Sequence, residues 1–194
     1  MAEAFPNHTR YIIPYRGFAP NRGQGLVLGE EAIKADAVRA HACVALHHAH
    51  VDVLGRSLGT GVALHVAARC EVRRVGLITP YDSILEVAKN RYRWLPVRVM
   101  LKDRFESWRD ALTVQAPILA LLAETDPVTP HRCWENLKRH FTAPIGVATI
   151  PGTNHTNIVE APMAWEELTR FFQGQVPASK ILKKQLLEGA APVA

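Results

Sequence analysis

Ser57 stands between two glycines, in the stretch Gly55-Arg56-Ser57-Leu58-Gly59, where an apolar run gives way to a helix-like pattern. A serine hydroxyl is a poor nucleophile unless a base, usually histidine, takes its proton and a carboxylate orients that histidine. A sharp strand-to-helix turn can present such a serine, and it requires small residues two positions to either side. Gly55 and Gly59 meet this requirement, and the backbone N–H of Leu58 would then point at a developing oxyanion.

Asp126 and His155 are the residues that could complete a nucleophilic system with Ser57. Each of the three follows an apolar run typical of a strand, and the carboxyl ends of parallel strands meet at one edge of a sheet. The order serine, aspartate, histidine is one of those in which triads occur. Taken singly, each has a simpler interpretation: a tight turn, a turn or helix cap, and a surface loop. Their joint occurrence favours the nucleophilic interpretation.

Short apolar runs alternate along the chain with longer amphipathic segments. Strands are predicted at 10–15, 51–55, 75–80, 116–124 and 145–152, and helices at 29–48, 58–69, 129–141 and 161–172. This alternation predicts an α/β fold with a mostly parallel sheet and helices on both faces. Thr129 is predicted to cap the helix that Pro130 begins, and Asp82 with Ser83 to cap a helix that follows them.

The composition is that of one globular domain. The chain has 194 residues, 48% of them hydrophobic, and a formal net charge of +5. Acidic residues are interleaved with many of the basic ones, so nucleic-acid binding is not expected. No run approaches the ~18 apolar residues of a membrane-spanning helix. The last segment, 174–194, is predicted to be a tail that follows the folded part.

Cysteine and histidine usage restricts the other chemistries. Cys43, Cys70 and Cys133 are far apart and odd in number, and the N-terminus has no apolar signal core, so a cytoplasmic protein without disulfides is expected. The histidines of HHAH (47–50) have no second cluster to share a metal ion with. A serine mechanism needs no organic cofactor, so neither a metal nor a cofactor is expected.

Several stretches together resemble the α/β-hydrolase superfamily of serine hydrolases. They are YRGFAPNRG (15–23), KADA (34–37), GRSLGTGVA (55–63), LITPYDSI (77–84), LPVRVMLKDRFES (95–107), AETDPVTP (123–130) and IPGTNHTNI (150–158). Within the superfamily, the chain resembles the subgroup that has a G-R-S-L-G nucleophile elbow and a preceding Y-R-G loop. The resemblance implies a hydrolase-like domain over 1–173, with a variable lid-side insertion at 81–112.

By that resemblance Ser57 is the nucleophile, Asp126 the acid, His155 the base and Leu58 an oxyanion donor. The expected substrate is a small acyl compound, a carboxylic ester or thioester, hydrolysed through an acyl-enzyme on Ser57. The residues expected to contact it are Arg56, Trp94, Phe105 and Trp108, although an aromatic-rich helix pair is also typical of simple packing.

Two departures from the family pattern bear on activity. Ala19 and Asn21 stand where the family has glycine and serine. In addition, the strand ending in a His-Gly motif, which the family places before the Y-R-G strand and which supplies a second oxyanion donor, has no counterpart here. The chain is therefore expected to lack the first strands of the fold and to have a weakened oxyanion hole.

Three explanations for the absent strand stay open: a start further upstream, a truncated gene, or a strand 10–15 that moves into the vacant place. The last predicts that 10–15 pairs directly with 51–55 in a sheet of about five strands, with Pro14 at the edge. The alternative to a hydrolase is a weak or inactive truncated fold that serves as a binding module. An exposed sheet edge would also permit a homodimer.

Overall fold

The structure, a computed structural model, describes residues 5, 7–18, 27–92 and 94–175 of the chain. Most of the predicted tail therefore lies outside the described residues. The elements are α1 (Glu30–Ala45), β1 (Asp52–Arg56), α2 (Leu58–Ala67), β2 (Arg74–Ile78), α3 (Ile84–Arg91), α4 (Val97–Met100), α5 (Ser107–Ala111), β3 (Ile118–Ala123), α6 (His131–Leu137), η1 (Lys138–His140), β4 (Ile145–Ile150), η2 (Asn157–Glu160) and α7 (Pro162–Phe172). The strands predicted from 51 onward and all four predicted helices are confirmed to within a few residues.

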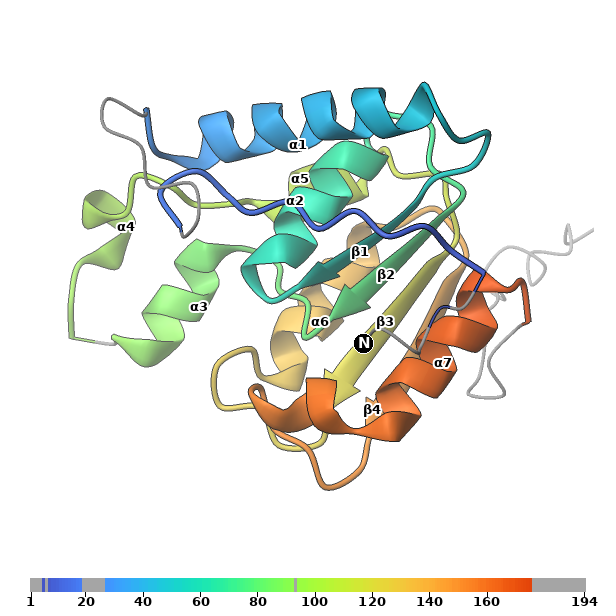
Figure 1. The fold of residues 1–194 in the computed structure, drawn as a ribbon. Coiled ribbons are helices and arrows are strands. Elements are labelled where there is room, and N and C mark those ends of the chain that lie inside the picture. The colour runs from blue at the N-terminus through green and yellow to red at the C-terminus, as the bar shows by residue number, and fades with distance from the viewer. Residues whose placement is uncertain (1–4, 6, 19–26, 93, 176–194) are drawn as a thin grey trace, which may run out of the picture.

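The four strands form one parallel sheet in the order β1-β2-β3-β4 (Figure 1). Successive parallel strands need a crossover, and helices provide each of them. Because all four strands run the same way, their carboxyl termini lie together at one end of the sheet. Ser57, Asp126 and His155 follow β1, β3 and β4 at that end.

Both faces of the sheet are covered, as the continuous apolar strands predict. In β3 the side chains of Ile118, Ala120 and Leu122 join a core with α2, α5 and α6. The alternate residues, Leu119, Leu121 and Ala123, join a second core with α7. Every residue of β3 is buried, since side chains alternate between the two faces of a strand.

Helix α1 forms an additional layer outside α2 (Figure 1). Its buried residues Ile33 and Ala37 pack with Val62 and Val66 of α2 in a third apolar cluster. Two glycines of α2, Gly59 and Gly61, belong to the turn that begins this helix. The helix that carries Ser57 at its N-terminus is thus held on one side by the sheet and on the other by α1.

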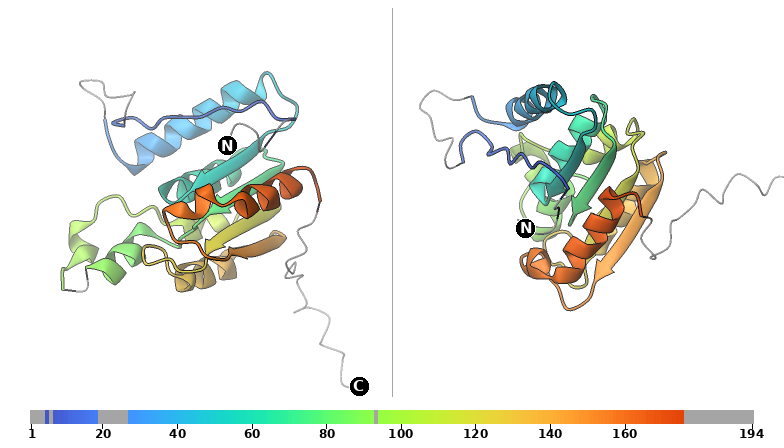
Figure 2. Two further views of the ribbon diagram at one scale, coloured as in Figure 1. Left: turned by 60° about the horizontal axis from the view of Figure 1, so that its bottom comes forward. Right: turned by 45° about the vertical axis from the view of Figure 1, so that its right-hand side comes forward.

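The prediction of a strand at 10–15 is wrong. The segment has no strand structure and pairs with no strand of the described sheet, and Figure 2 shows it running beside α1. Most of its apolar side chains are exposed: Ile12 is 83% exposed, and Tyr11 packs edge-on against His48, whereas Tyr15 is partly buried against the third apolar cluster. Pro14 has no N–H to donate to a ladder, which disfavours a strand here. The sheet of the described residues therefore has four strands, not five, with β1 at its edge.

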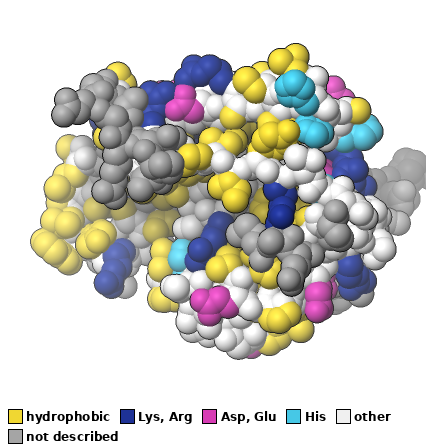
Figure 3. Space-filling view, viewed as in Figure 1, with side chains coloured by type: hydrophobic (Ala, Val, Ile, Leu, Met, Phe, Trp, Pro, Cys, Tyr) yellow, Lys and Arg dark blue, Asp and Glu magenta, His cyan; other side chains and the backbone are white. Residues whose placement is uncertain are grey.

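The segment 81–112 contains three short helices, α3, α4 and α5, of which α3 and α4 extend past the carboxyl ends of the strands (Figure 1). Apolar side chains gather on their surface at the left of Figure 3. Among them Tyr92, Trp94, Val99 and Met100 are 48–87% exposed. No helix in the described part of the chain is both long enough and apolar enough to cross a membrane.

Candidate active site

Ser57 occupies the junction between β1 and α2 in a strained backbone conformation. Its φ of 49° and ψ of −120° lie in a region that L-residues rarely adopt. Backbone hydrogen bonds hold it there: Ser57 donates its N–H to the carbonyl of Ile78 at 2.9 Å, and its own carbonyl accepts from the N–H and hydroxyl of Thr60. The turn therefore fixes Ser57 at the carboxyl end of the sheet, where the loops that carry Asp126 and His155 begin.

Gly55 shows why the turn requires small residues. A Cβ atom at Gly55 would lie 2.3 Å from the carbonyl oxygen of Gly59, a backbone atom that cannot rotate away. A Cβ at Gly61 would lie 2.5 Å from the hydroxyl of Tyr81, so this glycine permits a close contact between α2 and the segment after β2. The distance at Gly55 agrees with the small residue that the elbow pattern requires two positions before Ser57.

Leu58 is the first residue of α2, so its N–H has no acceptor within the helix. The N-terminus of a helix also carries partial positive charge, which favours an anion placed there. The group expected to donate to an oxyanion is therefore adjacent to the Ser57 hydroxyl. Residues 19–26 of the preceding loop, with Ala19 and Asn21, lie outside the described residues.

Asp126 lies in the turn after β3 and its side chain is 2% exposed. One carboxylate oxygen accepts from the N–H groups of Val128 and Thr129, each at 2.8 Å. The other accepts from the Thr129 hydroxyl at 2.9 Å and lies 2.8 Å from His155 Nδ1. Burial alone would raise the pKa of Asp126, but the hydrogen bonds from His155 and Thr129 outweigh it and lower the pKa below its ordinary value. The carboxylate is thus ionised and acts purely as an acceptor.

His155 joins the acid to the serine. Because an ionised carboxylate only accepts, Nδ1 of His155 must carry the proton donated to Asp126. Nε2 then has a free lone pair, and it lies 2.9 Å from the hydroxyl oxygen of Ser57. The structure therefore brings all three predicted residues into one hydrogen-bonded chain, which extends from a buried carboxylate to a hydroxyl at the start of α2.

The loop that carries His155 is braced by its own side chains. The Asn154 side chain accepts from the N–H groups of Thr156 and Asn157, and Asn157 accepts in return from the N–H of Asn154. Two further bonds tie the loop to the acid segment, from Gly152 N–H to Glu124 and from the Thr125 N–H to the carbonyl of Thr153. The loops that carry His155 and Asp126 thus form one connected unit.

Thr129 is a site residue that the sequence reasoning missed. It was expected to cap the following helix, but Pro130 occupies the N-cap of α6 and Thr129 instead binds Asp126 through both its N–H and its hydroxyl. Its hydroxyl also lies 3.3 Å from His155 Nδ1. The spacing Asp-x-x-Thr was the available signal, since an Asp side chain commonly accepts from the backbone two and three residues on. By contrast, the expected cap at Ser83 is confirmed.

The residues expected to contact substrate do not gather in one place. Trp94 is 81% exposed on the α3–α4 surface. Phe105 is buried in the cluster between α1 and α2, and Trp108 packs against the core beneath α2 and on the ring of His140. Phe105 and Trp108 thus take part in side-chain packing, as the aromatic-rich pattern also allowed. Arg56 donates to the backbone of the histidine loop.

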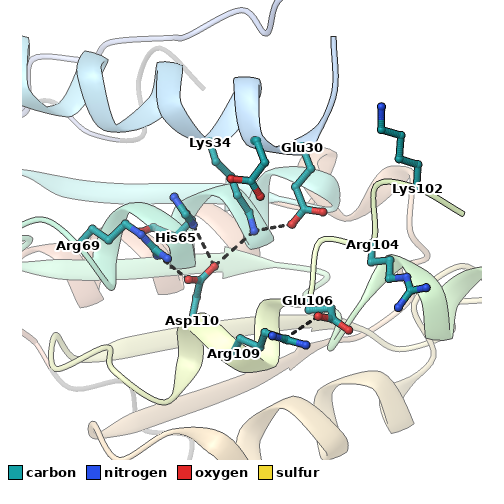
Figure 4. A pocket seen from close by; sticks show the side chains of 10 residues that line it. Glu30, Lys34, His65, Arg69, Lys102, Arg104, Glu106, Arg109 and Asp110 are labelled. Carbon is teal, nitrogen blue, oxygen red and sulfur yellow. Dashed lines mark hydrogen bonds and ion pairs between the residues drawn. The ribbon is translucent and has the colours of Figure 1, made fainter. Parts of the chain in front are cut away.

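A second histidine–aspartate pair lies in a charged pocket of about 360 Å³ between α1, α2 and α5 (Figure 4). His65 Nδ1 lies 3.2 Å from Asp110 Oδ2, Arg69 donates to the other carboxylate oxygen at 2.6 Å, and the Lys34 ammonium lies 3.7 Å from Asp110. Lys34 also pairs with Glu30 at 2.5 Å. Burial would raise the pKa of Asp110, but the bonds from His65 and Arg69 and the charge of Lys34 lower it.

Cysteines and potential metal ligands are dispersed in the structure. The described residues contain no group of three or more His, Cys, Asp or Glu side chains arranged to hold a metal ion. The three cysteines are free, and burial raises the pKa of Cys133 to about 12, which keeps it a thiol at neutral pH. By contrast, the side chains of Ser57, His155 and Asp126 converge in one series of hydrogen bonds.

Comparison with known sequences gives a distant likeness only. No protein-family model matches the chain. Two curated proteins of Mycobacterium tuberculosis, the uncharacterized proteins Rv2307c of strain H37Rv and MT2364 of strain CDC 1551 / Oshkosh, are each 27% identical over 166 residues. The match covers 82% of this chain and 58% of either relative, so the chain spans little more than half the length of these proteins.

Solved structures give a clearer likeness. The acetyl xylan esterase from Paenibacillus sp. R4 has a TM-score of 0.61 at 18% identity, over 75% of this chain and 53% of that one. The putative non-heme bromoperoxidase BpoC from M. tuberculosis H37Rv has 0.61 at 15%, over 82% and 79%. MGS-M2, an α/β hydrolase from a deep-sea metagenome library of the Medee basin, has 0.60 at 16%, over 79% and 76%. The parallel sheet with helices on both faces is therefore the fold of the α/β hydrolases.

Proposed function

We propose that the chain is a serine hydrolase that cleaves carboxylic esters or thioesters through an acyl-enzyme on Ser57. The observation that carries the proposal is the continuous hydrogen-bonded chain from Asp126 through His155 to Ser57, with distances of 2.8 Å and 2.9 Å. Distances in this range allow a base to remove the serine proton as attack occurs. The strained turn at Ser57 adds support, because backbone strain of this kind is concentrated at functional sites.

Acylation uses each member of the chain in turn. The Ser57 hydroxyl oxygen attacks the acyl carbonyl while its proton passes to His155 Nε2, and Asp126 stabilises the resulting imidazolium. The negative oxygen of the tetrahedral intermediate accepts from the N–H of Leu58. When the intermediate collapses, the bond to the alkoxide or thiolate breaks, and His155 returns the proton to that leaving group.

Deacylation repeats the same steps with water. His155 Nε2 takes a proton from a water molecule as the water oxygen attacks the ester carbonyl on Ser57. Collapse of the second intermediate releases the carboxylic acid, and His155 returns the proton to the Ser57 oxygen. No electron donor, metal or organic cofactor takes part in this sequence.

The exposed apolar surface of α3 and α4 is our candidate for the site that receives the acyl group. It contains Trp94 with Val99 and Met100, and it belongs to the segment that extends past the carboxyl ends of the strands (Figures 1 and 3). Exposed apolar patches are typical of ligand contacts. Trp94→Ala should therefore reduce turnover of p-nitrophenyl octanoate more than turnover of p-nitrophenyl acetate, whereas equal effects on both would contradict this assignment.

Active-site labelling is the direct test. A fluorophosphonate probe reacts with an activated serine, so it should label the wild-type chain on the peptide that contains Ser57. The Ser57→Ala variant should not be labelled. Ser83→Ala is the control, because Ser83 caps α3 and has no histidine partner, and it should be labelled like wild type. Labelling that survives Ser57→Ala would contradict the proposal.

Hydrolysis of short p-nitrophenyl esters and of acyl thioesters gives the second measurement. We expect turnover that is abolished by Ser57→Ala and His155→Ala. If the wild-type chain is neither labelled nor active, the hydrolase proposal is wrong, and the alternative of an inactive fold is favoured. The two measurements therefore separate an enzyme from an inactive relative of the hydrolases.

The edge of the sheet at β1 is our candidate surface for a homodimer. Among the described residues no strand pairs with its outer side, and Leu54 on this strand is 38% exposed. Unpaired strand edges favour pairing with a second chain. Sedimentation velocity over a range of concentrations should show a monomer–dimer equilibrium, and a monomer at every concentration would contradict this assignment.

A further inference from the structure

Arg56 connects the serine turn to the histidine loop through a single nitrogen. It is the last residue of β1 and directly precedes Ser57. Its Nη2 donates to the backbone carbonyl of His155 at 3.1 Å and to that of Thr156 at 3.0 Å, across 99 and 100 residues of chain. A guanidinium suits this position because it is planar, always charged and carries several donors in fixed directions.

From this geometry we infer that Arg56 is a positioning residue, which fixes the distance between the base His155 and the nucleophile Ser57. The inference rests on the proposed function and assigns Arg56 a different part from the substrate contact expected for it. The Arg56 guanidinium binds the backbone carbonyl of His155, and the ring of the same residue contacts the Ser57 hydroxyl. Its effect on the reaction is exerted through His155.

Apart from the Ser57–His155 bond, the other hydrogen bonds that the structure describes for the loop carrying His155 do not connect it to the serine turn. Those from Gly152 and Thr125 tie it to the segment of Asp126, and those of Asn154 lie within the loop. Within the part of the chain that the structure describes, the other hydrogen bond between the loop and the serine turn is the Ser57–His155 bond itself. Arg56 therefore supplies the connection on the serine side when the reaction breaks and remakes that bond.

The positions of the nucleophile and the base in the sheet make such a connection necessary. Ser57 follows β1 at one edge of the sheet and His155 follows β4 at the other, with β2 and β3 between them. Adjacent strands are about 4.8 Å apart, so the loop must return across roughly 14 Å of sheet to reach the serine. A loop of this kind moves readily unless its end is held, and a misplacement of about 1 Å costs on the order of 10²-fold in rate.

The substitutions that test the inference are Arg56→Gln and Arg56→Lys. We expect Arg56→Gln to lower kcat about 10-fold or more with KM within a factor of about two, since positioning acts on the chemical step and not on binding. Arg56→Lys keeps the charge and can reach one carbonyl, so it should recover part of kcat. Arg139→Gln is the matched control: it removes an exposed arginine charge from η1 and should leave both constants unchanged.

The rate of fluorophosphonate labelling is the second readout, because it reports the reactivity of Ser57 independently of acyl binding. It should fall in Arg56→Gln by the same factor as kcat, while the melting temperature stays close to that of wild type. A rise in KM with unchanged kcat and labelling would show that Arg56 contacts substrate, and it would overturn the inference. Unchanged constants would overturn it as well.

These outcomes are distinguishable from failure of the proposed function. If the wild-type chain is neither labelled nor active, the hydrolase assignment itself is wrong, and the role of Arg56 falls with it. If the wild type is labelled at Ser57 and Arg56→Gln is labelled at the same rate, only the positioning role is wrong. A kcat for Arg56→Lys that is no higher than that for Arg56→Gln would contradict the expected partial recovery and count against the inference.

Discussion

In the described part of the chain, two histidine–aspartate pairs have a buried aspartate, and their surroundings differ. In the first, His155 faces Asp126 at 2.8 Å, and in the second, His65 faces Asp110 at 3.2 Å. The pKa of each aspartate is lowered against the effect of burial by its hydrogen bonds. The pairs are alike in residue type and in the direction in which the aspartate pKa is shifted, so the difference between them lies in the other groups that each pair meets.

Around Asp126 the remaining donors are neutral: two backbone N–H groups and the hydroxyl of Thr129. The negative charge of the carboxylate is therefore not cancelled and can stabilise a positive charge on His155. The free ring nitrogen of His155 in turn faces a hydroxyl, which can lose a proton. This pair is arranged for proton transfer.

Around Asp110 the remaining partners are cations, Arg69 at 2.6 Å and Lys34 at 3.7 Å (Figure 4). The negative charge of Asp110 is therefore compensated by these cations. Its hydrogen bonds and ion pairs connect α1, α2 and α5. Lys34 belongs to α1, His65 and Arg69 to α2, and Asp110 to α5. A histidine–aspartate pair is thus a structural connection in one place and a candidate for catalysis in another, and the charge of the surrounding donors distinguishes them.

The largest expected contrast is in activity. Asp126→Asn should lower kcat by about 10⁴-fold, because an amide no longer holds His155 in the tautomer with a free Nε2. The same change in the second pair, Asp110→Asn, should leave kcat within a few-fold of wild type once the folded fraction is taken into account. Ester hydrolysis by the two purified variants measures this contrast, and comparable losses in both would remove it.

Double substitutions test whether Ser57 and His155 act together or contribute independently to the hydrolysis rate. The double variant Ser57→Ala with His155→Ala should be no less active than Ser57→Ala alone, because residues that act together lose their effect together. Adding His65→Ala to Ser57→Ala should likewise leave the residual rate unchanged. Multiplicative losses for the first pair would indicate that His155 has a separate part in the reaction.

Stability should show the opposite contrast. Asp110→Asn removes the carboxylate that Lys34 and Arg69 share. Arg69 is half exposed and Lys34 keeps Glu30, so the loss of unfolding free energy should be about 2 kcal/mol, between the values for exposed and buried ion pairs. Asp126→Asn should cost about 1 kcal/mol, because its partners are mostly neutral donors. Urea unfolding of both variants tests this order, and a larger loss in Asp126→Asn would reverse it.

The smallest expected effect is on the acid side of the stability profile. The pKa of Asp110 is lower in the folded chain than its ordinary value, so folding favours the ionised form. Its contribution is present above about pH 4 and is lost as the pH falls through the folded-state pKa. Unfolding free energy measured from pH 6 to pH 2 should therefore fall less steeply in Asp110→Asn than in wild type. Parallel profiles would mean that this pair contributes nothing to acid sensitivity.

The two pairs also differ in how far the sequence reveals them. Ser57, Asp126 and His155 each follow a strand, and parallel strands bring their carboxyl ends together, so their convergence could be expected from order alone. His65 and Asp110 lie on helices whose relative placement depends on packing between α2 and α5. No local pattern records which face of one helix meets the other, so this pair could not be anticipated.

The strand predicted at 10–15 failed for a related reason. Alternating apolar residues such as Tyr11 and Ile13 favour a strand, but a strand forms only where a partner edge meets it. The segment instead lies beside α1, where the Tyr11 hydroxyl bonds with His48. The aromatic residues Phe105 and Trp108 show the same limit, since composition alone does not separate a pocket lining from a core.

The position of β1 at the edge of the described sheet has a consequence for the nucleophile. Hydrogen exchange and local opening begin at the margins of a sheet, where each residue has fewer bonds to break. The serine follows the edge strand β1 and the base follows the other edge strand β4, whereas the acid follows the inner strand β3. Transient fraying of β1 would carry Ser57 away from His155, so faster amide exchange along residues 52–56 should accompany a smaller fraction of molecules that are poised to react.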